Sequence, residues 1–98
     1  MLIEASTDAA GASVLTVSGQ LDISNADELE QAVERAIARS PDGLVFDLSG
    51  LEFMDSAGIS VIVRAVSALD KVSLRNPSPM VRRLIEITGL SEILLVEP

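Results

Sequence analysis

Three carboxylates, Asp22, Asp47 and Asp55, and one serine, Ser56, are the side chains of this 98-residue chain best suited by type to chemistry. Carboxylates can act as general acids or bases, or they can hold a magnesium ion. The chain has no histidine, no cysteine and no phosphate-binding glycine motif, so the commonest general base and the thiolate ligands are missing. We therefore expect a binding protein rather than an enzyme, with no catalytic residue, no metal site and no cofactor.

Ser56 is the strongest single candidate. It lies in Phe53-Met-Asp-Ser-Ala-Gly-Ile59, between an apolar segment and a helical pattern. A serine at the start of a helix is usually only a cap. Asp55 can fill that role equally well, and open α/β sheets place ligand sites where parallel strands end. Ser56 is thus predicted to be exposed at a helix start, either as a cap or as a functional group.

The helix predicted over residues 57–69 has an unusual outer face. At about 100° per residue, Ile59, Ser60 and Val63 share that face with Ser56. The predicted core face holds Ala57, Val61, Ala65, Ala68 and Leu69. Exposed aliphatic residues beside a serine indicate a binding patch, although single exposed aliphatics are also common without any role. The pattern predicts that Ile59 and Val63 are exposed and contact a partner.

A second polar junction lies at Gly19-Gln-Leu-Asp-Ile-Ser-Asn-Ala26, before the helix predicted over residues 26–39. Ser24 or Asn25 can cap this helix, and an ordinary capped helix start would explain the segment. If the strands that precede the two junctions are parallel neighbours, Asp22, Ser24 and Asn25 lie at the same sheet edge as Ser56.

The hydrophobic pattern alternates between strands and helices. Strands are predicted at residues 2–6, 14–18, 44–48, 72–75 and 93–96, a third helix after Ser78, and a turn at 40–43. The order is β-β-α-β-α-β-α-β, and strands joined through helices pair in parallel with right-handed crossovers. We expect an α/β fold, a mixed and mostly parallel sheet with helices packed on it, in which residues 1–98 form a single domain.

Charge and hydropathy limit what this protein can bind and where it can act. The net charge is −8, and residues 1–56 carry eleven of the fifteen acidic side chains but two of the seven basic ones. Such a chain repels nucleic acid and anionic membranes, and its acidic face favours a basic partner. The N-terminus lacks the pattern of a signal peptide, and no apolar run reaches the roughly 18 residues of a membrane span. We expect a cytoplasmic protein.

Four segments carry a resemblance to a known family. They are Val17-Ser-Gly-Gln-Leu-Asp-Ile-Ser-Asn-Ala26, Val45-Phe-Asp-Leu-Ser49, Phe53-Met-Asp-Ser-Ala-Gly58, and Asn76-Pro-Ser-Pro-Met-Val-Arg-Arg-Leu84 through Thr88-Gly-Leu90. Together, in this order, they resemble the STAS-domain family, and specifically the stand-alone anti-sigma factor antagonists of bacteria. The resemblance spans nearly the whole chain.

The resemblance implies a phosphorylation switch. In that family an anti-sigma factor, itself a serine kinase, phosphorylates the serine that Ser56 matches; the unphosphorylated form binds the anti-sigma factor and frees a sigma factor, and a phosphatase resets the cycle. From the resemblance and the outer face of the helix together, the residues expected to bind the partner are Asp22, Ser24, Asn25, Asp55, Ala57, Gly58, Ile59, Ser60 and Val63. Ala57 departs from the family, which usually has a second serine there. An alternative is a STAS-type accessory or regulatory subunit of a transporter, but such subunits often lack the serine.

Overall fold

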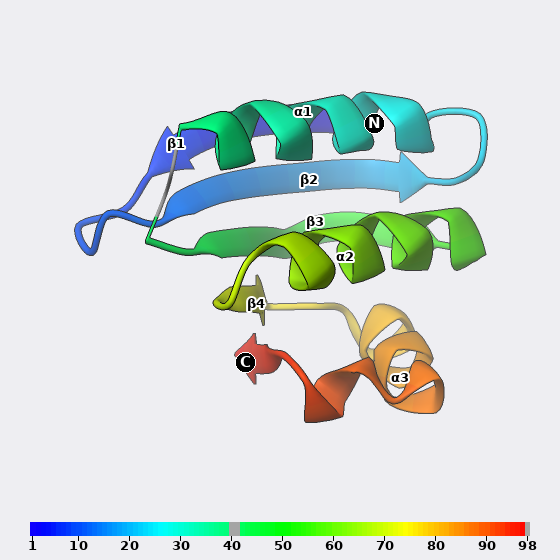
Figure 1. Ribbon diagram of the computed structural model, residues 1–98. Helices are drawn as coiled ribbons and strands as arrows, with labels where there is room; N and C mark the ends of the chain where they lie inside the picture. Colours follow the sequence, from blue (N-terminus) through cyan, green and yellow to red (C-terminus); the bar gives the residue numbers. More distant parts are fainter. Residues whose placement is uncertain (40–41, 98) are drawn as a thin grey trace.

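The computed structural model describes residues 1–39 and 42–97, and within them the chain forms a five-stranded sheet with α-helices on one face (Figure 1). In chain order the elements are β1 (Leu2–Thr7), β2 (Ser13–Leu21), α1 (Ala26–Ala38), β3 (Leu44–Met54), α2 (Ser56–Ala68), β4 (Val72–Arg75), α3 (Pro79–Thr88) and β5 (Leu95–Glu97). A short 3-10 helix, Leu90–Glu92, precedes β5. The predicted order and fold class are confirmed.

Sheet topology follows from the lengths of the connections. β1 and β2 form an antiparallel hairpin, whereas β2 to β5 are mutually parallel, in the spatial order β1-β2-β3-β4-β5. A short turn permits antiparallel pairing, while each parallel neighbour needs a crossover helix. The parallel strands therefore all end at the same edge, and Leu21 at the end of β2 pairs with Met54 at the end of β3.

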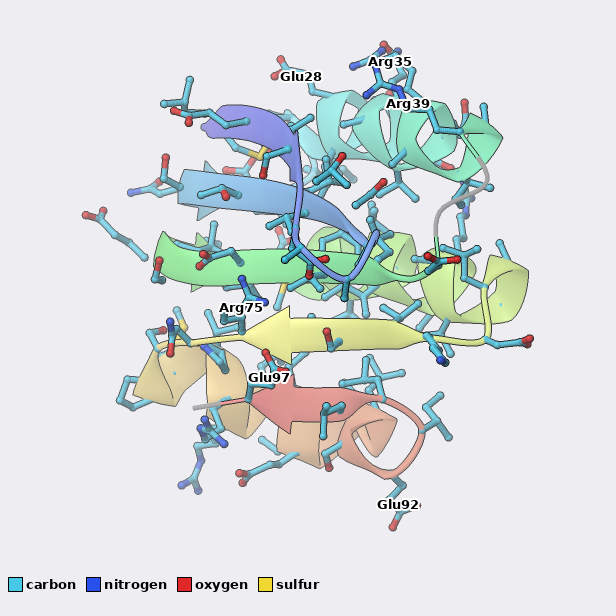
Figure 2. All side chains as sticks on the ribbon, turned by 90° about the vertical axis from the view of Figure 1, so that its left-hand side faces the viewer. Glu28, Arg35, Arg39, Arg75, Glu92 and Glu97 are labelled. Carbon is cyan, nitrogen blue, oxygen red and sulfur yellow. The ribbon has the colours of Figure 1, made fainter. Side chains whose placement is uncertain are left out.

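The core lies between the sheet and the helices. Phe46, Leu74 and Val17 in the sheet and Val81 and Ile85 in α3 are completely buried. Within residues 1–39 and 42–97, the opposite face of the sheet carries no helix and is largely polar (Figure 2). Because the side chains of a strand alternate between the two faces of the sheet, only every second residue of each strand needs to be apolar for the helices to pack on it.

Three strands differ from the sequence prediction by two or more residues at one end. β2 continues past Gly19, which adopts a φ of +88° beside register shifts in the β2–β3 ladder, as in a β-bulge. β3 extends to Met54, and Asp47 stabilises its middle by accepting hydrogen bonds from the Ser49 backbone (3.1 Å) and hydroxyl (2.8 Å). β5 begins at Leu95 because the preceding residues form the 3-10 helix. In the turn predicted at 40–43, residues 40 and 41 lie outside the described residues.

Candidate functional site

The two polar junctions meet at the end of β2 and β3, as the predicted parallel pairing required. The Asp55 backbone N–H donates to the carbonyl of Leu21 across the two strand ends (3.3 Å). A groove of about 440 Å³ opens beside them, between α1 and the start of α2. Its lining comprises Ile23, Ala26, Asp27, Glu30, Asp55, Ser56, Ala57, Ser60, Val61 and Arg64. The site thus combines residues more than 40 positions apart in the chain.

Asp55, and not Ser56, caps α2. Its side chain accepts a hydrogen bond from the Ala57 backbone N–H (2.8 Å), which leaves the Ser56 side chain without a capping role. Ser56 is exposed, and its hydroxyl makes no hydrogen bond to any described residue; its carbonyl accepts one from the Ser60 hydroxyl (3.1 Å). The serine is therefore accessible to a modifying enzyme.

The Asp22–Asn25 loop is closed by its own side chains. Asp22 accepts hydrogen bonds from the Ser24 backbone (2.9 Å) and from the Ser24 hydroxyl. Asn25 accepts from the Asp22 backbone N–H (3.0 Å) and donates to the Gln20 carbonyl (2.8 Å). Asn25 occupies the N-cap position of α1, as one of the two predicted candidates, but its side chain makes no capping hydrogen bond, because the Ser24 and Asn25 side chains are both used within the loop.

This loop presents an apolar residue that sequence reasoning missed. Ile23 is 85% exposed at the rim of the groove, between the hydrogen-bonded Asp22 and Ser24. Its signal in the sequence is a single large aliphatic residue within an otherwise polar turn. Arg64 of α2 was also missed; it forms an ion pair with Glu30 of α1 beside the groove.

The buried face of α2 is rotated from the predicted one. Its buried residues are Gly58, Val61, Ile62 and Ala65, whereas Ala68 is exposed. Val63 is 41% exposed, so its predicted exposure is confirmed, whereas its contact with a partner stays a prediction. Ile59 is half-buried and packs against the core, so its predicted exposure is wrong. The predicted core face lacked Gly58 and Ile62. Because the buried face of α2 includes these two residues, Ile59 lies at the border of that face.

Gly58 has a packing role. A Cβ atom at this position would lie 2.5 Å from Cγ of Met54 and 2.8 Å from Cδ2 of Leu21, so the first turn of α2 can approach the strand ends only with glycine here. Because Gly58 is buried, we assign it to supporting the site rather than to contacting a partner. Ala57 is half-buried and Ser60 is exposed.

The hydrogen bonds from Ser24, first from its side chain and then from its backbone, lower the pKa of the Asp22 carboxyl group below its ordinary value. Folding therefore favours the ionised form, and its contribution is present above the ordinary value of 3.8 and is lost as the pH falls through the lowered pKa. We predict that Ser24→Ala raises the pKa of Asp22 toward its ordinary value. A carboxyl NMR titration measures it, and an unchanged pKa would show that the Ser24 hydroxyl does not hold the carboxylate.

The described residues offer no other obvious chemistry. Within 1–39 and 42–97, no group of three or more histidine, cysteine, aspartate or glutamate side chains could hold a metal ion. None of the helices in this part of the chain is both long and apolar enough to cross a membrane. The groove is the place where the polar loops, the exposed Ser56 and the exposed Ile23 come together.

A mixed sheet with helices on one face and two polar loops at one edge defines a small α/β interaction domain. The chain belongs to the STAS-domain family, whose model matches residues 5–98. It is 31% identical over 85 residues to the anti-sigma-F factor antagonist RsfB of Mycobacterium tuberculosis, covering 84% of this chain and 70% of that protein. It is 33% identical over 87 residues to the anti-sigma-B factor antagonist of Listeria monocytogenes, covering 83% and 75%.

A solved structure gives the same result. The crystal structure of an anti-sigma factor antagonist from Mycobacterium paratuberculosis has a TM-score of 0.87 and 37% sequence identity to this chain, and the match covers 99% of this chain and 83% of that one. The resemblance drawn from the four sequence segments is thereby confirmed at the level of the family and the fold.

Proposed function

We propose that this protein is a cytoplasmic anti-sigma factor antagonist whose binding is switched by phosphorylation of Ser56. In the unphosphorylated state it binds an anti-sigma factor that is a serine kinase, and a sigma factor is released. A phosphatase restores this state after phosphorylation, and the chain itself performs no catalysis. The relatives named above support the class of function. The observation that carries the switch is the exposed Ser56, freed from capping by Asp55.

In the phosphorylation reaction this chain acts only as the phosphoryl acceptor. The Ser56 Oγ attacks the γ-phosphorus of ATP held by the kinase, the new Oγ–P bond forms, and the bond from the γ-phosphorus to the bridging oxygen breaks. ADP leaves, and the hydroxyl proton passes to a base of the kinase. The N-terminal end of α2 tolerates the added anion through the helix dipole, so the product is expected to keep its fold.

Affinity capture from the native cytoplasm tests the class of partner. The Ser56→Ala variant, which cannot be phosphorylated at this position, is expected to capture a sigma-regulating kinase at least as well as the wild-type chain does. Capture of a transporter subunit in place of a kinase would contradict the proposal and favour the accessory-subunit alternative.

The two aliphatic residues of α2 are expected to behave differently. Val63→Glu should weaken partner binding by about 1 to 3 kcal/mol, because it places a charge in an apolar contact, and should leave the melting temperature nearly unchanged. Ile59→Glu should lower the melting temperature, because Ile59 packs against the core. Calorimetric titration and thermal unfolding of both variants check this. A large loss of stability in Val63→Glu would show that Val63 is a core residue.

A further inference from the structure

The outer edge of β1 is unprotected. β1 is the first strand of the sheet, so its outer backbone groups have no neighbouring strand among the described residues. All of Leu2–Thr7 except Ile3 is exposed, including Leu2 at 59%. Natural edge strands usually carry lysine, proline or a bulge that prevents pairing with another chain. β1 has none of these, and Glu4 is its only charge.

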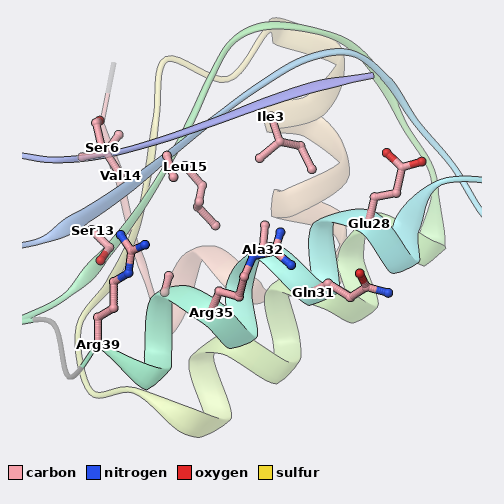
Figure 3. A pocket seen from close by; sticks show the side chains of 12 residues that line it. Ile3, Ser6, Ser13, Val14, Leu15, Glu28, Gln31, Ala32, Arg35 and Arg39 are labelled. Atoms are coloured by element: carbon pink, nitrogen blue, oxygen red, sulfur yellow. The ribbon is translucent and has the colours of Figure 1, made fainter.

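A groove of about 390 Å³ runs between β1 and α1 (Figure 3). Ile3 lies toward the Glu28 end of α1 and Ser6 toward the Arg39 end. None of its lining residues belongs to the groove at Ser56. The two surfaces are therefore separate, and both can be occupied at the same time.

The charges of α1 along this groove are arranged in a self-complementary way. Glu28, Arg35 and Arg39 all line it, and at about 100° per residue they fall within about 40° of one another on the helix. The ion pairs within residues 1–39 and 42–97 involve Arg64 and Arg75, so Arg35 and Arg39 are unpaired there (Figure 2). This row of three charged residues has a glutamate at one end and two arginines at the other. Two copies of the row that run antiparallel therefore place opposite charges next to each other.

We propose that this edge binds a second copy of the chain, with β1 pairing antiparallel to β1 about a two-fold axis. The sheet then continues through both copies, and the two α1 helices run antiparallel on the same face of it. Arg35 and Arg39 of each copy face Glu28 of the other, as an isologous interface requires. The net charge of −8 opposes association, so the dimer is weak and depends on protein concentration.

The register follows from side-chain parity and charge. Opposed residues of antiparallel strands point to the same face of the sheet. An odd-numbered residue of β1 can therefore lie opposite only an odd-numbered one, and an even-numbered residue only an even-numbered one. If the two-fold axis passed through Glu4, the Glu4 carboxylates of the two copies would lie opposite each other, which is destabilising. Centring on Ala5 instead opposes Ala5 to itself, Glu4 to Ser6 and Ile3 to Thr7. A centre at Ile3 or Ser6 would pair a shorter part of Leu2–Thr7 than a centre at Ala5 does, so we place Ala5 on the two-fold axis.

Charge exchange along the stripe tests the interface. Sedimentation velocity should show concentration-dependent dimers of the wild-type chain, and either Glu28→Arg or the double change Arg35→Glu with Arg39→Glu should raise the dimer Kd about tenfold or more. An equimolar mixture of the two variants should associate again, because every contact across the axis is then complementary. Glu34→Arg, the same charge change on an α1 residue that does not line the groove, should leave the Kd unchanged.

Cysteine cross-linking tests the register, because this chain has no cysteine of its own. Ala5→Cys should form an intermolecular disulfide on mild oxidation, since residues opposed in antiparallel strands lie about 5 Å apart at Cα. Ser6→Cys should not, because two such residues would be about 8 Å apart. Equal cross-linking at both positions would overturn the register.

Two results would overturn the pairing itself. One is a wild-type chain that stays monomeric up to roughly 1 mM, where even weak specific dimers form. The other is a monomer that binds an acidic extended peptide at β1 and loses it in the Arg35→Glu, Arg39→Glu variant, since the arginines would then recognise a foreign strand.

Discussion

Ser56→Asp is expected to bind the anti-sigma factor at least about a hundredfold more weakly than Ser56→Ala, because each 1.4 kcal/mol of added cost lowers affinity about tenfold. A phosphoryl group adds a charge of about −1.5 to −2 at neutral pH, so phosphorylated Ser56 should bind more weakly still. Neither change should alter the fold, since Ser56 is exposed and makes no capping bond.

The size of this effect comes from the groove around Ser56. Its lining includes the carboxylates Asp27, Glu30 and Asp55, and the one cation that lines it among the described residues, Arg64, is already paired with Glu30. A further negative charge is well solvated in the free protein. Docking removes water from it beside like charges, which costs several kcal/mol when no partner charge compensates. The proposed switch therefore lies where an added charge is tolerated in the free protein but opposes binding.

Titration of the wild-type, Ser56→Asp and Ser56→Ala chains against the cognate anti-sigma factor measures the effect, and circular dichroism of each monitors the fold. Equal affinities of Ser56→Asp and Ser56→Ala would contradict the switch. An altered spectrum in Ser56→Asp would contradict the local-charge mechanism while leaving the switch in place.

Ile23→Asp is expected to weaken the same complex by about 2 kcal/mol or more, roughly thirtyfold. Ile23 is 85% exposed in the free protein, and complete burial of an isoleucine side chain is worth about 1.5 to 3 kcal/mol. The Asp22–Asn25 loop is already held by its own hydrogen bonds, so little conformational freedom is lost on docking. A rigid loop that presents an apolar side chain beside the proposed phosphorylation site has the properties of an interface anchor.

Ile87→Asp is the matched control. Ile87 is 73% exposed on α3, which contributes no residue to the Ser56 groove. Both variants should keep the wild-type melting temperature, and only Ile23→Asp should lose affinity in calorimetric titration. Equal affinities of the two variants would remove Ile23 from the interface.

The position of the site could be predicted because it depends on strong local patterns. Strand–helix alternation requires parallel pairing, and parallel pairing brings the Asp22 and Ser56 loops to one edge. The cap at Ser78 with Pro79 and the left-handed Gly89 at the end of α3 were likewise predictable. In each case the residue type has one common structural use in that setting.

The phase of α2 could not be predicted with the same success. Ile59, Val61, Ile62 and Val63 are all aliphatic, so hydropathy hardly distinguishes its faces. Its orientation is set instead by Gly58, which lets the helix approach Met54 and Leu21, and a contact of this kind depends on tertiary packing.

The use of Asn25 could not be predicted either, because its amide had two available roles. It can cap α1 or close the preceding loop, and the two roles compete for the same side chain. In the structure the Asn25 side chain closes the loop and does not cap α1. The exposure of Ile23 depends on that outcome.

Phosphorylation by the cognate anti-sigma factor kinase, mapped by mass spectrometry, tests the central claim most directly. Wild-type chain and Ser60→Ala should each take up one phosphoryl group on Ser56 and then lose binding to the kinase. Ser56→Ala should take up none and stay bound. Ser60 is the matched control because it is an exposed serine lining the same groove, one turn away on α2. Phosphorylation of Ser56→Ala at another residue with loss of binding, or a Ser56-phosphorylated chain that still binds, would contradict the account.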